Sequence, residues 1–436
     1  VIEINLHRRT IMSEFDKIIG YTNEKEEMMR LCDVLKNKEK YIAFGVKIPK
    51  AVLLYGEPGL GKTLMAKAFI TETGRKVFFC KKNKPDGEFV DKIKETFENA
   101  IKEAPSVIFF DDMDKFAEDN LQRNSNKEEF VSIQTGLEEI GDKDVFVIAT
   151  ANDTTYLPDS LMREGRFGRQ IEFNNPSFED SLKIIEHYMA NKRISEEINA
   201  QSLVHIIGGS SCAVLESVIN EAGIYAAYEG RSEIRYCDIK RAVSSVILKR
   251  YPLKESDNNL KWRLSYHEAG HAIIGLVNNV SVGCLAIGKC GQYGQDKGVC
   301  RLYDTSNSMS FEKSKYRIMS LLAGKASVEI QFNEVDLGAV KDLSSATDII
   351  DDLMQRIAAD GFEFFYPKEE YCNAQSYRQL DKLQEKRLRL IEEYYNNTKL
   401  LLLKNKELLD RLASELYEKE VLLYDEIMAI AGEYLH

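Results

Sequence analysis

The sequence predicts an α/β domain with a parallel sheet, then a small all-helical subdomain, then a third domain that is mainly helical. Three patterns lead to this prediction. Apolar strand candidates alternate with amphipathic helix patterns up to about residue 176, helical periodicity continues alone from 178 to about 249, and helices dominate again beyond 311. A chain of 436 residues is long enough for two or three domains. We expect these domains at residues 1–178, 179–252 and 253–436.

The individual elements follow from local composition. Candidate buried strands of the first domain lie at residues 51–55, 76–80, 106–111 and 144–150. A polar stretch at 118–129 predicts an exposed loop. Pro252 and the polar residues after it indicate a linker at 251–260, and the Gly-rich, β-forming segment 281–303 predicts hairpins.

A phosphate-binding loop follows the first strand candidate, and the helix pattern after it begins at Leu64. The loop has the spacing GxxxxGK[ST] and consists of Gly56, Glu57, Pro58, Gly59, Leu60, Gly61, Lys62 and Thr63. Its glycines allow backbone N–H groups to surround a phosphate, and the helix N-terminus adds a favourable dipole. Lys62 would reach the β- and γ-phosphates, and the Thr63 hydroxyl would help to hold Mg²⁺. The sequence therefore predicts a site for ATP and Mg²⁺.

Polar residues after the later strand candidates fit the same chemistry. Asp111 ends the third strand candidate, where it can bind Mg²⁺, and Asp112 can polarise the attacking water. Asn152 follows the fourth candidate and can report on the γ-phosphate. Three arginines follow in the next segment: Arg163, Arg166 and Arg169. Their guanidinium groups can stabilise charge on the transferred phosphoryl group across a subunit boundary. The alternative interpretation is that they form surface ion pairs.

A second motif lies in the third domain. His267, Glu268 and His271 form HExxH in a helix-compatible run, so both imidazoles project from one helix face and can bind one Zn²⁺. Residues 272–295 contain no Asp, Glu or His, so the third ligand must lie farther along the chain. The candidates are Glu329, Glu334, Asp336, Asp342 and Asp348.

Composition narrows the classes of partner. The formal net charge of −11 argues against nucleic acid as the main partner. Eight cysteines without a CxxC pair indicate free thiols in a reducing compartment. Without an apolar run of membrane-spanning length or a visible signal peptide, we expect these residues to be cytoplasmic.

Taken together, these motifs resemble the FtsH-type proteases, in which an AAA+ ATPase is fused to a zinc metallopeptidase. The resemblance is carried by the strings at 56–63, 110–114, 149–152, 165–170, 220–222, 266–273, 323–326 and 346–349. It implies that Asn152 is the sensor and that Arg166 and Arg169 are arginine fingers. It also implies that Ile19, Gly20 and His187 flank the adenine.

The same resemblance implies a third zinc ligand. In such proteases this ligand is an Asp that opens a helix after a small polar turn, and the string 344–348 matches, which predicts Asp348 with Glu329 as the reserve. Zinc held by His267, His271 and Asp348 would activate a water, and Glu268 would accept its proton and deliver it to the leaving amine.

Assembly and substrates are also implied by the resemblance. The family forms hexameric rings that thread unfolded protein through a pore into a proteolytic chamber, and many members carry a membrane anchor. We therefore expect a homohexamer acting on unfolded or loosely folded proteins, with membrane association only through a segment absent from this chain. The leading hypothesis is an ATP-driven zinc endopeptidase.

Two departures from the family pattern motivate alternatives. Asp112 stands where the family usually has Glu, and the pore segment at 81–90 is short and charged, with Phe89 as its remaining aromatic residue. One alternative is a zinc peptidase whose ATPase ring is mainly structural or regulatory. The other is a remodelling or scaffold ATPase without proteolysis.

Overall fold

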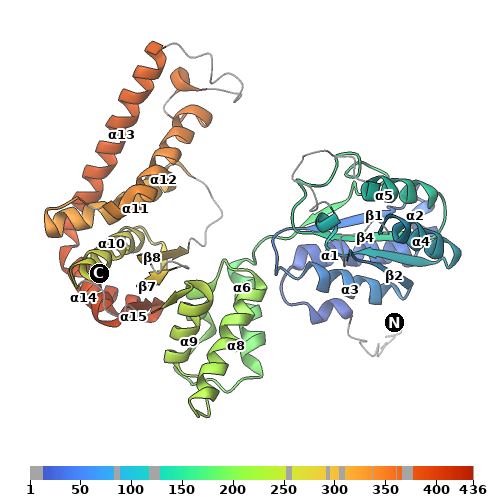
Figure 1. The fold of residues 1–436 in the computed structure, drawn as a ribbon, viewed down its shortest axis with the longest axis horizontal. Helices are drawn as coiled ribbons and strands as arrows, with labels where there is room; N and C mark the ends of the chain where they lie inside the picture. The colour runs from blue at the N-terminus through green and yellow to red at the C-terminus, as the bar shows by residue number, and fades with distance from the viewer. Residues whose placement is uncertain are drawn as a thin grey trace, which may run out of the picture. The chain divides into compact units, whose positions relative to one another are not determined.

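The computed structural model describes residues 13–82, 89–116, 128–251, 258–290, 295–303, 310–335, 337–359, 361–365 and 377–435. The chain divides into two compact units, whose folds are drawn in Figure 1. The first consists of Val1–Tyr188 with Gly209–Glu216, and the second of Met189–Gly208 with Ser217–His436.

A five-stranded sheet forms the centre of the first unit, with the order β2-β3-β4-β1-β5 and every pair parallel (Figure 1). Its strands are β1 (Ala51–Tyr55), β2 (Lys76–Cys80), β3 (Ser106–Phe110), β4 (Val145–Ala151) and β5 (Gln170–Glu172). The first four confirm the predicted segments to within a residue. The sequence reading missed β5, because so short a strand shows no apolar pattern of its own.

Four helices cover the two faces of this sheet: α1 (Thr22–Lys36), α3 (Lys62–Thr73), α4 (Phe89–Lys102) and α5 (Glu128–Glu139). The unit also contains α2 (Lys38–Ile42), most of α6 (Phe178–Ala190) and 3-10 turns at Glu14–Lys17 and Met113–Phe116. Because successive strand residues point to opposite faces, Leu53 packs with α4 and α5, whereas Val52 and Leu54 pack with α1 and α3. This double cover holds the carboxyl ends of the strands along one fixed edge. Residues 118–127 of the loop predicted at 118–129 lie outside the described part, and α5 begins at Glu128.

The second unit is mainly helical. Its helices are α7 (Ala200–Ile207), α9 (Tyr236–Ala242), α10 (Asn258–Val277), α11 (Phe311–Phe332), α12 (Val340–Asp351), α13 (Tyr377–Lys404), α14 (Lys406–Lys419), α15 (Tyr424–Gly432) and most of α8 (Cys212–Tyr228). Short turns lie at Val243–Ile247, Leu337–Ala339, Asp352–Arg356 and Phe362–Phe364. Apolar residues of α10, α11, α14 and β7 (Ser281–Cys290) form its largest core. The HExxH helix is thereby packed on several sides.

A small antiparallel sheet lies beside α10. Strand β7 pairs with β8 (Gln295–Tyr303) as the predicted hairpin, and also with β6 (Arg250–Tyr251) and β9 (Val421–Leu423). Residues 252–257 of the predicted linker lie outside the described part, and its last residues instead begin α10 at Asn258. The helix pattern of α10 therefore starts earlier than the polar composition indicates.

Helices α7 and α9 pack against elements that follow the HExxH helix. The His205 ring stacks on Tyr424 at 4.2 Å between centroids, and the Ser202 hydroxyl donates to Asp425 Oδ1 at 2.6 Å. Lys240 in α9 pairs with Glu426 at 3.0 Å. By length and composition, no single described helix qualifies as a membrane span, although the bent pair α7 and α8 would qualify together.

Candidate functional site

The phosphate loop joins β1 to α3, as its sequence predicts. Gly56, Gly59 and Gly61 all have positive φ, at 140°, 82° and 88°. A Cβ atom at position 56 would lie 2.0 Å from the Phe173 carbonyl oxygen, so only glycine fits there. The backbone therefore curls tightly into the N-terminus of α3, as a phosphate site requires.

Lys62 is buried at the start of α3. Its Nζ donates to the carbonyl oxygens of Gly56 at 2.6 Å and Glu57 at 2.7 Å, and to Asn152 Oδ1 at 3.0 Å. Burial lowers the pKa of Lys62, and the nearby carboxylates of Asp114 and Asp112 oppose that shift. The lysine and the predicted sensor thus meet inside the loop.

The two predicted acids lie where β3 ends. Asp111 Oδ1 accepts hydrogen bonds from the hydroxyls of Thr63 at 3.1 Å and Thr150 at 3.0 Å. The Asp112 backbone N–H donates to Thr150 Oγ1 at 3.0 Å, and its φ is +56°. A hydroxyl and a carboxylate side by side are oxygen ligands of the kind that Mg²⁺ takes, so these residues fit the ion.

The remaining loop residues differ in exposure. Leu60 is buried, whereas Glu57, Pro58 and Leu64 are exposed. The Gly59 carbonyl accepts a hydrogen bond from the Ala213 backbone N–H at 3.0 Å. The beginning of α8 therefore touches the phosphate loop.

The residues expected near the adenine lie close to α6. A Cβ atom on Gly20 would meet Asp180 at 3.0 Å, and the exposed His187 lies about two turns farther along α6. Ile19 precedes Gly20 and is partly buried. The hydroxyl oxygen of the neighbouring Tyr21 lies 3.5 Å from Cys212 Sγ. Sequence reasoning missed Cys212 and Ala213, because neither has a distinctive chemistry.

Both predicted arginine fingers form ion pairs inside the first unit. Arg166 donates to Glu138 Oε1 and to the Ser160 carbonyl, each at 2.6 Å, and Arg169 donates to Glu27 Oε1 at 2.9 Å. The isolated chain therefore does not test their expected role across a subunit boundary, and that role stays a prediction.

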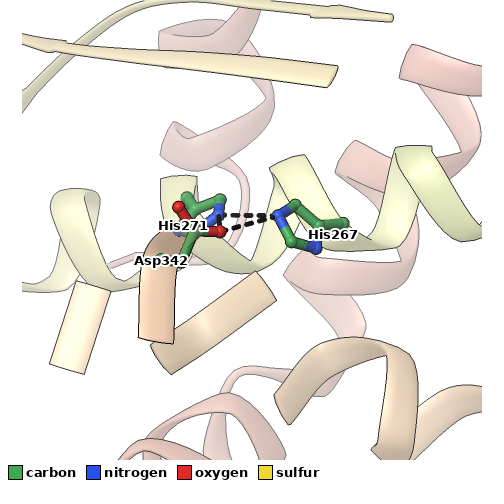
Figure 2. Close-up of side chains that lie close together, drawn as sticks. All are labelled: His267, His271 and Asp342. Carbon is green, nitrogen blue, oxygen red and sulfur yellow. Dashed lines mark hydrogen bonds and ion pairs between the residues drawn. The ribbon is translucent and has the colours of Figure 1, made fainter. Parts of the chain in front are cut away.

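Three side chains in the second unit point at one position, as Figure 2 shows. His267 Nε2 and His271 Nε2, from α10, lie 3.1 Å apart, and Asp342 Oδ2 from α12 lies 3.2 Å and 3.5 Å from them. Among the described residues, this is the cluster of His, Cys, Asp and Glu that has metal-ligand spacing. Two imidazole nitrogens and a carboxylate oxygen are the donor set that zinc prefers, so the residues fit Zn²⁺.

The third member of the cluster corrects the prediction. Asp342 meets the histidines, whereas Asp348 is exposed on α12. The predicted kind of residue, an Asp that opens a helix, is right, but α12 begins at Val340 and not near Asp348. The two acids are six residues apart, about 240° around the helix, so they lie on different faces.

The other candidate ligands are used elsewhere. Glu329 pairs with Lys399 at 2.7 Å and with Lys325 at 3.3 Å, and Glu334 pairs with Arg263 at 2.5 Å. Asp336 lies outside the described residues. Among the candidates that the structure describes, only Asp342 reaches the histidines.

Neighbouring backbone fixes the two imidazoles. His271 Nδ1 lies 2.6 Å from the Ser320 carbonyl oxygen, to which its N–H donates, leaving Nε2 as the ligand atom. A Cβ atom at Gly324 would lie 2.4 Å from His267 Cε1, so this glycine of α11 makes room for the ring. The HExxH helix and α11 thus orient both ligands before any metal arrives.

Glu268 is buried beside the cluster, against strand β8. A Cβ atom at Gly298 would lie only 1.8 Å from Glu268 Oε1, so the carboxylate occupies the space that a side chain would take. Sequence reasoning missed Gly298, because nothing in its surroundings distinguishes it from a turn glycine. The predicted base is therefore held in place by the strand backbone.

A pocket of ≈ 740 Å³ opens over these residues. Its walls include the leucines Leu264, Leu302 and Leu321, with Arg263 and Lys341 among the polar groups. A cavity of this size with apolar walls and a few polar groups can take part of an extended peptide.

Comparisons with known proteins agree with this pair of sites. Residues 52–175 match the model of the ATPase family associated with various cellular activities (AAA), and residues 254–430 match that of Peptidase family M41. A protein of Aster yellows witches'-broom phytoplasma (strain AYWB), named ATP-dependent zinc metalloprotease FtsH, is 31% identical over 439 residues, covering 95% of this chain and 64% of that protein. The chain belongs to the FtsH family.

Further relatives carry the same name. One from Helicobacter pylori (strain J99) is 29% identical over 454 residues, which cover 96% of this chain and 71% of that relative. One from Alkalihalophilus pseudofirmus is 30% identical over 455 residues, which cover 97% of this chain and 66% of that relative. This FtsH-family chain therefore spans about two thirds of the length of these relatives.

Phe89, the aromatic residue that remains in the pore segment, is a core residue. Phe89 is 4% exposed, and its ring lies 4.8 Å from that of Phe116 inside the first unit. It opens α4 as a core residue, so it is not free to grip a substrate. The preceding residues 83–88 of the predicted pore segment lie outside the described part of the chain.

Proposed function

We propose that this FtsH-family protein is an ATP-dependent zinc endopeptidase that unfolds and degrades proteins. The observation that carries the proposal is the convergence of His267, His271 and Asp342, with Glu268 beside them, in a chain that also holds a complete phosphate site. The matching AAA and M41 models support the same conclusion.

The peptidase chemistry follows from the residues around the metal centre. When bound, zinc would activate a water and polarise the scissile carbonyl. The buried Glu268 carboxylate would accept a proton from that water and pass it to the leaving amine. Since Gly298 leaves Glu268 no freedom on the β8 side, the carboxylate is positioned before substrate binds.

The ATPase chemistry requires more than one subunit. Lys62 would bind phosphate oxygens, Thr63 and Asp111 would hold Mg²⁺, and Asp112 would orient the attacking water. Arg166 and Arg169 would complete a neighbouring subunit's site, which calls for a closed ring, and we propose a homohexamer. Their present partners Glu138 and Glu27 would hold these arginines until the ring forms.

We further propose that the substrates are unfolded or loosely folded proteins, and that these residues act in the cytoplasm. The acidic balance, with a formal net charge of −11, supports protein rather than nucleic acid as the partner.

A second candidate function is a zinc peptidase whose ATPase ring mainly builds and regulates the chamber. The burial of Phe89 favours it, because this aromatic residue of the pore segment is committed to the core. Asp112 also favours this function, because aspartate is one methylene shorter than the glutamate usual in the family and would hold the attacking water less well, which slows ATP hydrolysis. A remodelling or scaffold ATPase without proteolysis is disfavoured by the assembled metal cluster.

The test is degradation of unfolded casein with and without ATP, by the wild type and by Glu268→Gln and Lys62→Ala variants. We expect casein loss that needs ATP, Glu268 and Lys62 together. Cleavage that needs Glu268 but is indifferent to ATP and to Lys62→Ala would support the regulatory ring instead. If a zinc-loaded wild type cleaves nothing in either condition, the protease proposal is wrong.

A further inference from the structure

Lys81, the first residue of the predicted pore segment, lies beside the acids of the nucleotide site. It follows β2 directly, and β2 pairs with β3 so that Cys80 is opposite Phe110. Because parallel strands end at the same edge of a sheet, Lys81 arrives beside the two acids that follow β3. Its Nζ lies 2.6 Å from Asp111 Oδ2 and 3.5 Å from Asp112 Oδ2.

This contact completes the hydrogen bonding of the Asp111 carboxylate. Thr63 and Thr150 donate to Oδ1, and Lys81 donates to Oδ2. The Asp111 carboxylate is therefore already paired with a cation of the same chain, on the oxygen that the threonines leave open.

We propose that Lys81 is a built-in counter-ion of the Mg²⁺ site, which holds Asp111 and Asp112 and competes with the ion for Asp111. This inference rests on the nucleotide site proposed above. Mg²⁺ and an ammonium group carry the same sign, so they repel each other when both approach one carboxylate. Binding of Mg²⁺ with nucleotide therefore works against the Lys81–Asp111 ion pair.

The exposure of Lys81 suits such an exchange. Its side chain is 49% exposed, so it can leave Asp111 without becoming an unpaired buried charge. Lys115 stays on Asp112 at 2.9 Å, so the second acid keeps a partner after Lys81 leaves. Lys81 is in this sense a positioning residue for hydrolysis: it acts through the acids that hold the ion and the water.

Metal binding gives a readout that does not depend on turnover. Mn²⁺ can replace Mg²⁺, and free Mn²⁺ is measured by electron paramagnetic resonance in the zinc-loaded protein with and without ADP. The ADP-dependent part, after subtraction of the Mn²⁺ that the same ADP binds without protein, isolates the nucleotide site from the zinc site. For Lys81→Met, which keeps the length of the side chain but not its charge, we expect Mn²⁺ to bind about fivefold more tightly.

Lys115→Met is the matched control. Lys115 is 47% exposed and pairs with Asp112, and it forms no described ion pair with Asp111. Lys115→Met therefore changes the net charge by the same amount as Lys81→Met but leaves the Lys81–Asp111 pair in place. We expect a clearly smaller shift for Lys115→Met and none for Lys81→Arg. If Lys81→Met does not fold, Lys81→Gln replaces it.

Several outcomes would overturn the inference. Unchanged or weaker Mn²⁺ binding in Lys81→Met would show that Lys81 does not compete with the ion, and equal shifts in the Lys81 and Lys115 variants would reduce the effect to net charge. If one of these outcomes is found while the wild type binds ADP normally, only the Lys81 inference is rejected and the proposed nucleotide site stands. A wild type without any ADP-dependent Mn²⁺ binding would reject both proposals.

Discussion

At the scale of single residues, small differences in position decide which acid can serve the metal centre. Asp342 and Asp348 lie on the same helix, yet only Asp342 points at His267 and His271. Its oxygen lies 3.2 Å from His267 Nε2. Identical side chains on one helix thus provide an internal control for the assignment.

The first prediction uses that control. Asp342→Asn should lower the zinc content per chain and reduce proteolysis by more than about 100-fold. Mutation of a residue that only hydrogen-bonds to a metal ligand already reduces metal affinity or activity by up to about 100-fold, and Asp342 is a ligand itself. Asp348→Asn should keep both. Zinc is measured by emission spectrometry after gel filtration, with circular dichroism as the test of folding. Full zinc in Asp342→Asn and loss in Asp348→Asn would reverse the assignment.

The second prediction concerns Gly298. Gly298→Ala should push the Glu268 carboxylate aside and lower kcat for peptide cleavage by about 100-fold, as a misplacement of about 1 Å can. Zinc content should not change. Gly432→Ala is the control, because a Cβ atom there meets nothing within 4 Å.

A double variant separates this positioning from a general loss of structure. Glu268→Asp retracts the carboxylate by one methylene, so it should relieve the clash. Gly298→Ala should then be much less harmful when it is combined with Glu268→Asp than when it is made in the wild type. Additive losses in kcat would mean that Gly298 acts on the fold and not on the base.

At the scale of elements, α11 determines much of the metal centre. It places Ser320 against His271 and Gly324 against His267, and its far end carries Glu329. Glu329 binds Lys399 and Tyr395 of α13, so these contacts couple α11 to the longest helix of the unit. A residue considered as a zinc ligand therefore has a structural task instead.

The third prediction follows from the charge of Glu329. Hydrogen bonds from Lys399 and Tyr395, with Lys325 assisting and burial opposing, lower the pKa of Glu329 to about 2. Since this lies below the unfolded value of about 4.3, Glu329 stabilises the fold above that pH, and the contribution is lost as pH falls towards 2.

Glu329→Gln should therefore unfold at lower urea than the wild type at pH 7, and the gap should narrow at pH 3.5. Unfolding can be followed by fluorescence of Trp262, the chain's single tryptophan, which stacks on Tyr417 at 4.2 Å in the same unit. A gap that is absent at pH 7, or that widens in acid, would contradict the assigned pKa.

At the scale of the whole molecule, each unit carries one chemistry. The parallel sheet holds Asp111 and Asn152 at the carboxyl ends of β3 and β4, with Lys62 of α3 beside Asn152, whereas α10 and α12 build the metal centre. The arginines proposed to act in a neighbouring subunit are paired within their own chain. The proposed ring must therefore break these pairs as it assembles.

The fourth prediction tests that ring. Arg169→Ala should reduce ATP hydrolysis by about 1,000-fold, as loss of an arginine finger does. Mixing it with Lys62→Ala subunits should restore activity above either parent, because Lys62→Ala still supplies Arg169 to the neighbouring site. A mixture of Asp112→Asn with Lys62→Ala is the control and should stay inactive, since both defects lie within their own subunit. No rescue in the first mixture would contradict an arginine acting across subunits.

The sequence by itself determined those parts of the sites whose residues are neighbours along the chain. The phosphate loop and HExxH are recognisable because a tight turn and one helix face bring together residues a few positions apart. Strands β1, β3 and β4 were predictable for a similar reason, since a strand buried on both faces is a continuous apolar run. Strand β2 lies at the sheet edge and is partly exposed, but its apolar, β-forming residues still identify it. The acids after β3 and the predicted sensor Asn152 after β4 were candidates because the carboxyl ends of parallel strands meet at one edge of a sheet.

Only the tertiary structure decided the contacts between distant segments. Asp342 replaced Asp348 because the start of α12, which sets the face that each acid occupies, was not evident from composition. Lys81 and Gly298 reach their sites through the pairing of β2 with β3 and the packing of β8 against α10. Phe89 became a core residue because α4 begins with it. Side-chain chemistry names the candidates, but packing selects which of them meet.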